Sequence, residues 1–462
     1  MTRKNIMKKN NIYQFFNTKG LLLIILLAFV IRIVFFVSLQ PWDNEVVNKT
    51  IIINDASGYH QLALSLLSNK SFEGFDGFRT PGYPVFVALL YSISSGSVWF
   101  VLFIQILLNL ISVLLVYKIA STIFSRKIAL LSAFLFAIDI HQALFAVTLC
   151  SDTLFVFLFL ASINYLCKSI KEIDFFILCL SAFILGIATL ERPVSFLVPF
   201  VVIFFILMLC NLKLKVKLIY SLLYGIIFVT TISPWLLHNY TKYGVAKLTS
   251  QSGSNLLFCN VAFTEAYKTG KSIEQVNKYF FDLAIKQGID TTGRNSFKNS
   301  QIYSNIAQQY IKDNFILYCK RHFMGIVNMY AGLVTSHITS ILHLKSNPLN
   351  VGLEAGPNIF NRIIDFFHSK TIAEIFIALG LGFYLLINYL FTFYAIFLLI
   401  RKKEKFVFLF IIIIFYFSII TGVIGNARLR IPFMPFINIL CAVGLFHLYV
   451  KIIVDKLVKV KN

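Results

Sequence analysis

The chain has 462 residues, of which 58% are hydrophobic and only 13% are charged. Soluble globular proteins carry roughly a quarter charged residues, so this composition excludes that class and indicates an integral membrane protein. The formal net charge of +22 does not indicate a nucleic-acid partner, because the basic residues lie in short clusters at the ends of apolar runs, where they orient membrane spans.

The apolar runs predict transmembrane helices. A helix needs about 20 residues to cross a hydrocarbon layer of about 30 Å, and no run has the alternating ten-residue pattern of a membrane β-barrel. Basic residues recur on alternate sides of the runs, so the positive-inside rule gives about ten spans, with both chain ends cytoplasmic. The predicted spans are residues 20–39, 98–118, 128–144, 152–167, 174–190, 194–210, 218–236, 372–400, 406–423 and 431–450.

The first outer loop, residues 41–97, concentrates ionisable and aromatic residues between two spans. The stretch 82–93 inside it is apolar but too short to cross a membrane. Pro81 just before it and Pro84 inside it suit a first helical turn, so we predict a juxtamembrane or re-entrant helix there. Arg32, inside the first span, is costly in lipid and is expected to reach the outer boundary.

A second polar segment, residues 237–371, precedes the last three spans and is predicted to be mostly helical. Ser272 and Gln275 have the spacing of a capping box, which predicts an amphipathic helix ending near Gly288. The same spacing recurs at 300–311, whereas 315–342 is apolar but basic and is predicted to lie on the membrane surface. Cys259 and Cys319 both fall in this segment, where two unpaired thiols are favoured over a disulfide.

These features divide the chain into three predicted units. Residues 1–236 form an N-terminal transmembrane catalytic module with seven spans, residues 237–371 form an extracytoplasmic or juxtamembrane segment, and residues 372–462 form the last three spans.

The topology places ionisable residues from distant loops at one outer interface. Carboxylates there can accept a proton, and arginines can hold a phosphate through paired charge-assisted hydrogen bonds. Each also has a structural alternative, because the aspartates can cap helices, an adjacent Glu-Arg pair can bond internally, and arginines can extend toward headgroups. The residues are Asp55, Arg79, Asp152, Glu191, Arg192, His238, Arg428 and Arg430. Four histidines are interpreted as interfacial residues in preference to ligands, and they are His141, His238, His322 and His343.

The order of several motifs resembles glycosyltransferase family 39, a group of GT-C membrane enzymes that includes protein O-mannosyltransferases and lipid A aminoarabinose transferases. The resemblance covers roughly the first 245 and the last 40 residues. Many relatives have an Asp-Glu pair in the first outer loop, whereas here Asp55 is followed by Ala56. The motifs are Asp55 four residues before Tyr59, Arg79-Thr80-Pro81-Gly82-Tyr83-Pro84, Asp152 at the start of a span, Glu191-Arg192-Pro193, Pro234-Trp235 and Arg428-Leu429-Arg430.

The resemblance implies a GT-C fold and the transfer, with inversion, of a sugar from a polyprenyl-phosphate carrier to a hydroxyl of a lipid, glycan or protein acceptor. The reaction would take place on the extracytoplasmic face of a cell membrane, in a bacterium. Asp55 would be the general base, and Asp152 would supply the second catalytic carboxylate. The implied substrate-binding residues are Tyr59, His60, Arg79, Glu191, Arg192, Arg428 and Arg430.

Two other function classes compete with this interpretation. A transporter or flippase of lipid-linked saccharides would place ionisable residues near the membrane midplane in paired halves, whereas here they lie at one face. In a non-catalytic membrane subunit the outer carboxylates would be replaceable. No ligand spacing demands a metal, so no cofactor is predicted, although a divalent cation is left open. The residues do not identify the sugar, the acceptor, the carrier length or the oligomeric state.

Overall fold

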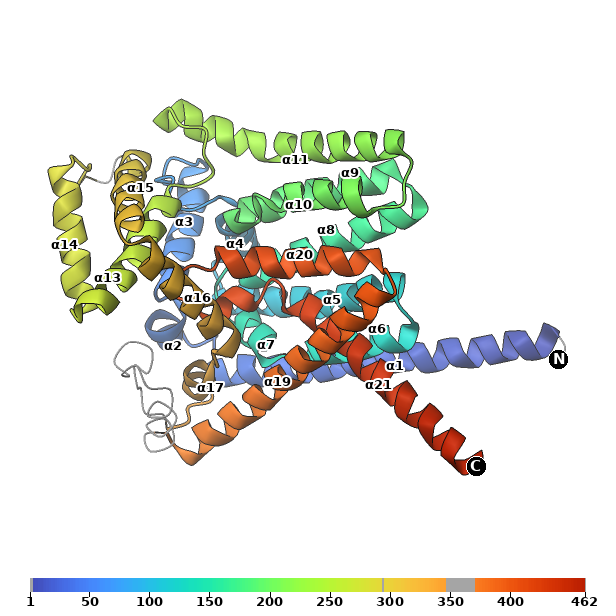
Figure 1. The fold of residues 1–462 in the computed structure, drawn as a ribbon. Helices are drawn as coiled ribbons and strands as arrows, with labels where there is room; N and C mark the ends of the chain where they lie inside the picture. The colour runs from blue at the N-terminus through green and yellow to red at the C-terminus, as the bar shows by residue number, and fades with distance from the viewer. Residues whose placement is uncertain (1–2, 293–294, 346–369, 462) are drawn as a thin grey trace.

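The computed structural model describes residues 3–292, 295–345 and 370–461, with side chains described between residues 19 and 452 of these ranges. Every regular element in the described ranges is a helix (Figure 1). The predicted all-α class is therefore confirmed. Most of the basic side chains near the two chain ends that set the predicted orientation, and residues 346–369 of the predicted outer segment, lie outside the described part.

Six helices are long and apolar enough to cross a membrane. They are α1 (Arg3–Leu39), α5 (Val98–Ile123), α8 (Asp152–Glu172), α11 (Leu214–Tyr243), α19 (Ile372–Arg401) and α21 (Met434–Lys461). A seventh span is possible where α6 (Arg126–Ala137) and α7 (Ile140–Ala146) form a pair bent by 57°. The other three predicted spans correspond to shorter apolar helices, which are α9 (Phe175–Glu191), the Pro193–Leu209 stretch containing α10 (Val198–Phe204), and α20 (Lys405–Ile420). The chain is thus a polytopic membrane protein, and the count of ten spans stays a prediction.

The bend between α6 and α7 explains Arg32. Its guanidinium is fully buried, so the expectation that it reaches the outer boundary was wrong. It donates to the carbonyl oxygen of Ala137, where α6 ends, and its Nε lies 2.9 Å from Oδ1 of Asn109 on α5. A helix that breaks inside an apolar layer leaves carbonyl groups that water cannot reach. Arg32 therefore satisfies the broken end of α6 from the neighbouring helix.

The antiparallel pair α8 and α9 positions two residues of the site. Ser162 on α8 and Ser181 on α9 exchange hydrogen bonds, each hydroxyl donating to the other residue's carbonyl oxygen at 2.9 and 2.8 Å. Small polar residues at such an interface let two helices approach closely within a membrane. Because the helices run in opposite directions, the start of α8 and the end of α9 come together at the same end of the bundle.

The helices of the two polar segments, 41–97 and 237–371, lie at the end of the bundle opposite to both chain termini (Figure 1). The first outer loop contributes α2 (Asn44–Val46), α3 (Asp55–Asn69) and α4 (Gly82–Ser94), so the predicted short helix at 82–93 is confirmed. The later segment contributes α12 (Gln251–Ser254), α13 (Ala262–Thr269), α14 (Ile273–Lys286), α15 (Ser296–Asp313), α16 (Phe315–Ala331) and α17 (Thr335–Ile341).

Two predicted helices of this later segment are also confirmed, whereas the membrane-surface position of 315–342 stays a prediction. Ser272 and Gln275 form the capping box that begins α14, and α15 covers the predicted helix at 300–311. Cys259 and Cys319 are free thiols. Part of the segment has a small apolar core of its own, which includes Val261 and Phe280.

Candidate active site

Two carboxylates and three arginines form one network at one end of the bundle. Arg428 bridges the carboxylates, with Nη1 2.9 Å from Oδ2 of Asp55 and Nη2 2.7 Å from Oδ2 of Asp152. Arg79 Nη2 lies 3.1 Å from the other oxygen of Asp55. Arg192 donates to the other oxygen of Asp152. The structure therefore brings together five of the nine residues predicted from sequence.

Each member of the network comes from a different element. Asp55 begins α3 and Asp152 begins α8, where the positive end of a helix favours a carboxylate. Arg192 directly follows α9, and Arg428 lies in the single turn η5 (Ala427–Arg430) before α21. Arg79 lies in the loop before α4.

The alternative that the aspartates serve as helix caps is not realised. The N-cap positions of α3 and α8 are held by Asn54 and Ser151, and all four carboxylate oxygens of the two aspartates accept from arginines. Asn54 has φ +50° and ψ −124°, a conformation that non-glycine residues rarely adopt. Strained backbone of this kind often accompanies a functional residue.

The arginines set the charge state of Asp55. Burial by itself would raise the pKa of this carboxyl, but the hydrogen bonds and charges of Arg428 and Arg79 outweigh that effect and lower its pKa below the ordinary value. Burial would likewise lower the pKa of Arg428, yet the two aspartates and neighbouring groups raise it instead. Three guanidinium groups against two carboxylates leave one formal positive charge in the network.

Tyr59 packs against Arg79 of the network. The guanidinium carbon of Arg79 is 4.3 Å from the centre of its ring, a cation–π distance. Its hydroxyl lies 3.3 Å from Oγ of Ser151, the residue before Asp152. Burial raises the pKa of Tyr59, so the phenol stays protonated at neutral pH. Tyr59 is thus positioned to support Arg79 and the start of α8.

His60 turns away from the network. Its Nδ1 lies 2.9 Å from the hydroxyl of Tyr91 on α4, and burial lowers the pKa of the imidazole. The neutral ring therefore joins α3 to α4, and the structure does not bring it to the arginines.

Arg430 also lies apart, although it is only two residues from Arg428. It is fully buried, and its Nη1 donates to the carbonyl oxygens of Met329, Tyr330 and Gly332 at 2.7 to 3.1 Å. These carbonyls belong to the end of α16, where the last four have no partner inside the helix. Nη2 of Arg430 contacts the buried ring of His141, which is therefore not interfacial as predicted. The contacts of Arg430 are those of a helix cap, and they replace the phosphate contact that the sequence suggested.

Glu191 is buried beside the network without joining it. Its neighbour Arg192 bonds Asp152, so the alternative of an internal Glu191 and Arg192 pair is not realised. The backbone of Glu191 instead receives the Arg79 loop, because Thr80 donates to its carbonyl oxygen at 3.3 Å. A Cβ on Gly82 would lie 2.7 Å from the same backbone, so glycine is needed at this contact.

Gly58 was missed by sequence reasoning. A Cβ at this position would lie 2.7 Å from Nε of Arg79, so the absence of a side chain lets the arginine cross α3 and reach Asp55. A glycine inside a helix costs roughly 1 kcal/mol relative to alanine. A glycine inside a predicted helix, one turn after the candidate base Asp55, is the sequence feature that could have indicated a close contact there.

A large apolar cavity lies between α16, α19, α20 and α21, with a volume of about 820 Å³. Tyr330 forms part of its wall through a hydroxyl 2.7 Å from Oγ of Ser418, and its carbonyl oxygen accepts from Arg430. Because α16 packs against η5, the cavity lies beside the turn that carries Arg428. Its other lining residues include Ile326, Leu333, Leu385, Tyr389, Ile411 and Phe415.

Within the described residues, no group of three or more His, Cys, Asp or Glu side chains is arranged to hold a metal ion. The expectation of no cofactor stays a prediction.

Comparisons with known proteins place this geometry in a family context. The family described as dolichyl-phosphate-mannose-protein mannosyltransferase matches residues 79–238, which include Arg79, Asp152 and Arg192. Asp55 and Arg428 lie outside the matched range. The predicted resemblance to glycosyltransferase family 39 is therefore confirmed over this part of the chain. No curated protein matches the chain.

Solved structures share the fold. The archaeal oligosaccharyltransferase AglB from Archaeoglobus fulgidus, in complex with an inhibitory peptide and a dolichol-phosphate, matches with a TM-score of 0.56 and 12% identity over 97% of this chain and 52% of that chain. A complex of the A. fulgidus oligosaccharyltransferase with Zn and sulfate matches with a TM-score of 0.51 and 12% identity, over 94% and 49% of the two chains. This chain thus spans about half the length of these proteins.

A weaker similarity relates the chain to ArnT from Cupriavidus metallidurans bound to undecaprenyl phosphate, with a TM-score of 0.41 and 12% identity over 92% of this chain and 77% of that chain. The chain has the GT-C fold of a polytopic membrane protein.

Proposed function

We propose that this chain is a membrane glycosyltransferase that moves a sugar from a polyprenyl-phosphate carrier to an acceptor hydroxyl, with inversion, on the extracytoplasmic face of a cell membrane. The observation that carries the proposal is the network in which Arg428 bridges Asp55 and Asp152 while Arg79 and Arg192 each bind one of them. The family match and the shared fold with an oligosaccharyltransferase solved with a dolichol-phosphate support a lipid-phosphate donor.

The donor would use both the network and the apolar cavity. A polyprenyl chain is apolar and fits among the side chains between α16, α19, α20 and α21, while its phosphate is an anion that arginine forks bind through paired charge-assisted hydrogen bonds. The excess of one guanidinium over the carboxylates favours an incoming anion. We assign the phosphate to Arg428, Arg79 and Arg192.

The aspartates hold the arginines in place until the phosphate arrives. A phosphate that takes Nη1 of Arg428 would release one oxygen of Asp55, and the loss of that hydrogen bond would raise the pKa of the carboxyl from its lowered value. A higher pKa makes a carboxylate a better general base. Donor binding would therefore activate the base at the moment when the sugar is in place.

The reaction follows from these positions. The acceptor hydroxyl oxygen attacks the anomeric carbon on the side opposite to the phosphate, and its proton passes to Asp55. The bond from the anomeric carbon to the phosphate oxygen breaks, and its electron pair stays on the phosphate. The arginines stabilise the charge that develops there, where donors fixed in advance have their largest effect. Asp152 keeps Arg192 and Arg428 oriented toward that charge.

The proposed membrane side rests on the arrangement of the chain. Helices α3 and α4, which flank Asp55 and Arg79, lie at the end of the bundle opposite to both termini (Figure 1), and we expect the basic clusters of the sequence at the other end.

The test compares two acids of the same outer loop. Asp55→Asn and Asp43→Asn are made in the full chain, reconstituted in vesicles with a panel of undecaprenyl-phosphate-linked hexoses and pentoses and a crude envelope extract as acceptor. Release of undecaprenyl phosphate is measured. Asp55→Asn should abolish release, whereas Asp43, an exposed residue that caps α2, should be replaceable. Near-normal release by Asp55→Asn would refute the proposed base.

A further inference from the structure

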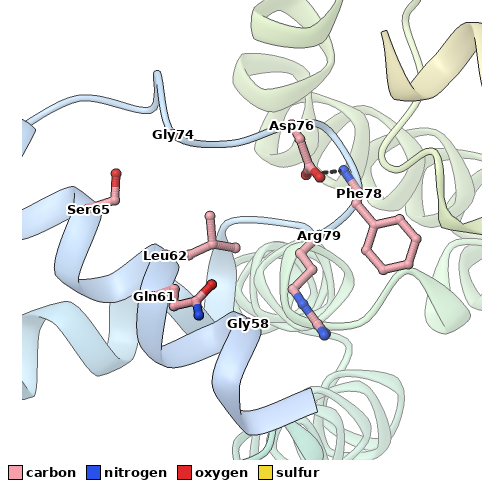
Figure 2. Close-up of a pocket in the computed structure, with 8 residues that line it drawn as sticks. All are labelled: Gly58, Gln61, Leu62, Ser65, Gly74, Asp76, Phe78 and Arg79. Atoms are coloured by element: carbon pink, nitrogen blue, oxygen red, sulfur yellow. Dashed lines mark hydrogen bonds between the residues drawn. The ribbon is translucent and has the colours of Figure 1, made fainter. Parts of the chain in front are cut away.

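A smaller pocket opens beside Arg79, separate from the apolar cavity, with a volume of about 360 Å³. Figure 2 shows α3 as one wall, with Gln61, Leu62 and Ser65, and the loop that carries Asp76 and Arg79 as the other. Gln61 and Asp76 are exposed, so the pocket is open to water. All its lining residues come from the first outer loop, and they are Gly58, Gln61, Leu62, Ser65, Gly74, Asp76, Phe78 and Arg79.

The pocket follows the face of α3 that begins with Asp55. Four residues of α3 are spaced by three, four and three positions, which places them along one side of the helix. They are Asp55, Gly58, Leu62 and Ser65. With a rise of 1.5 Å per residue, the stretch from Gly58 to Ser65 is about 10 Å long. Arg79 lines the pocket and also bonds Asp55. A ligand that lies along this face therefore ends next to the proposed base.

The loop that forms the second wall is fixed by its main chain. The carbonyl oxygens of residues 73, 75, 76, 77 and 78 all accept hydrogen bonds from the end of α11, from the loop that follows it or from α15. The donors are Lys242, Tyr243, Thr249, Ser250 and Ser296.

These bonds limit what the pocket can recognise. An extended peptide binds to a sheet edge or exposed strand through free main-chain groups, and the carbonyls of this loop are already used. Side chains with further hydrogen-bonding capacity remain to meet a ligand, with Leu62 as an apolar surface. Gln61 donates one amide hydrogen to Ser57, Ser65 accepts from Asn69, and Oδ1 of Asp76 accepts from the backbone N–H of Phe78, which leaves the amide oxygen, the hydroxyl hydrogen and Oδ2 of these side chains for the ligand. Such a mixture of donors and acceptors matches a compact molecule with several hydroxyl groups.

We propose that this pocket binds the sugar ring that carries the acceptor hydroxyl, so that the acceptor of the proposed transfer is a saccharide. The inference rests on the proposed function and names its acceptor class. The volume is near the lower limit of the roughly 300–1,000 Å³ of small-molecule sites, which suits one or two sugar rings. The acceptor thus enters from the water-facing side, whereas the donor's lipid lies in the apolar cavity, with which the pocket shares no lining residue.

The test measures binding of simple glycosides without requiring transfer. Saturation-transfer NMR is recorded on the full chain in lipid nanodiscs, with methyl glycosides of glucose, galactose, mannose and N-acetylglucosamine, and separately with a peptide rich in Ser and Thr. Gln61→Ala and Ser65→Ala should each weaken binding of the best glycoside about fivefold, the loss expected for one hydrogen bond. Ser68→Ala is the matched control, because Ser68 is exposed one turn further along α3 and donates to its own helix.

The outcomes separate this inference from the proposed function. No glycoside binding by the unchanged chain, equal binding by all variants, or binding of the peptide in place of the glycosides would each overturn the saccharide assignment. Stabilisation by undecaprenyl phosphate is measured on the same samples by thermal unfolding. Its absence in the unchanged chain would count against the proposed function, while the glycoside result would still decide what the pocket binds.

Discussion

Arg428 and Asp55 are in contact although 373 residues separate them in the chain, with 2.9 Å between Nη1 and Oδ2. The same guanidinium also bonds Asp152. The predicted division puts both aspartates in the unit 1–236 and Arg428 in the unit 372–462. The network therefore crosses this boundary, and the predicted N-terminal module does not hold the complete candidate site by itself.

Arg428→Gln should remove the central donor of the proposed phosphate site. We expect a loss of about 10²- to 10³-fold in the rate of transfer, as for removal of one donor that stabilises developing charge. Undecaprenyl phosphate should no longer raise the melting temperature of the variant. Arg428→Lys should recover little, because an ammonium group cannot bridge two carboxylates as the planar fork does. Unchanged stabilisation by the lipid phosphate in Arg428→Gln would contradict the assignment.

The lowered pKa of Asp55 predicts how stability depends on pH. A carboxyl whose pKa is lower in the folded than in the unfolded chain, where it is about 3.9, contributes stability above that value. The contribution is lost as the pH falls through the lowered pKa of the folded state. The apparent melting temperature of the unchanged chain should therefore fall more between pH 6 and pH 3 than that of Asp55→Asn. Parallel curves for the two proteins would show that the Arg428 and Arg79 contacts do not stabilise the ionised carboxylate.

Sequence reasoning could place Asp55, Arg79, Asp152, Arg192 and Arg428 at one end of the bundle. Apolar length and the distribution of basic residues fix which loops share a membrane side, and arginines beside acids in such loops indicate an anion site. The contacts themselves, such as the bridge by Arg428, follow from helix packing and were not predicted.

The partners of Arg430 could not be predicted from the positions of basic residues in the sequence. It is two residues from Arg428 in the same short turn, yet its direction is set by the end of α16, about a hundred residues earlier in the chain. The same is true of Arg32, whose partner is a helix break elsewhere in the bundle. A long basic side chain can reach in several directions, so its role depends on which backbone groups are left without partners nearby.

Arg430→Met should therefore affect stability more than chemistry. The substitution leaves the carbonyl oxygens at the end of α16 and the ring of His141 without their donor in a buried region, and an unsatisfied buried group costs about 1–3 kcal/mol. We expect a clear drop in the melting temperature, with stabilisation by undecaprenyl phosphate retained in the fraction that folds. The comparison with Arg428→Gln lies in the lipid effect, which that change should abolish and Arg430→Met should retain. Loss of the lipid effect at unchanged melting temperature would place Arg430 in the phosphate site after all.

Gly58→Ala tests whether the crossing of Arg79 over α3 is needed. The added Cβ would lie 2.7 Å from Nε and 3.0 Å from Nη2 of Arg79, so the guanidinium must shift from the position in which it contacts Asp55. Alanine is also the better helix former by roughly 1 kcal/mol, so the helix itself should not be weakened. We expect transfer to fall at least tenfold with little change in melting temperature.

Gly380→Ala on α19 is the matched control for this change, because a Cβ there meets nothing within 4 Å among the described residues. Both variants gain the same helix propensity, and only Gly58→Ala disturbs an arginine of the network. Equal transfer rates in the two variants would contradict this prediction. They would show that transfer does not require Arg79 to cross α3 at Gly58.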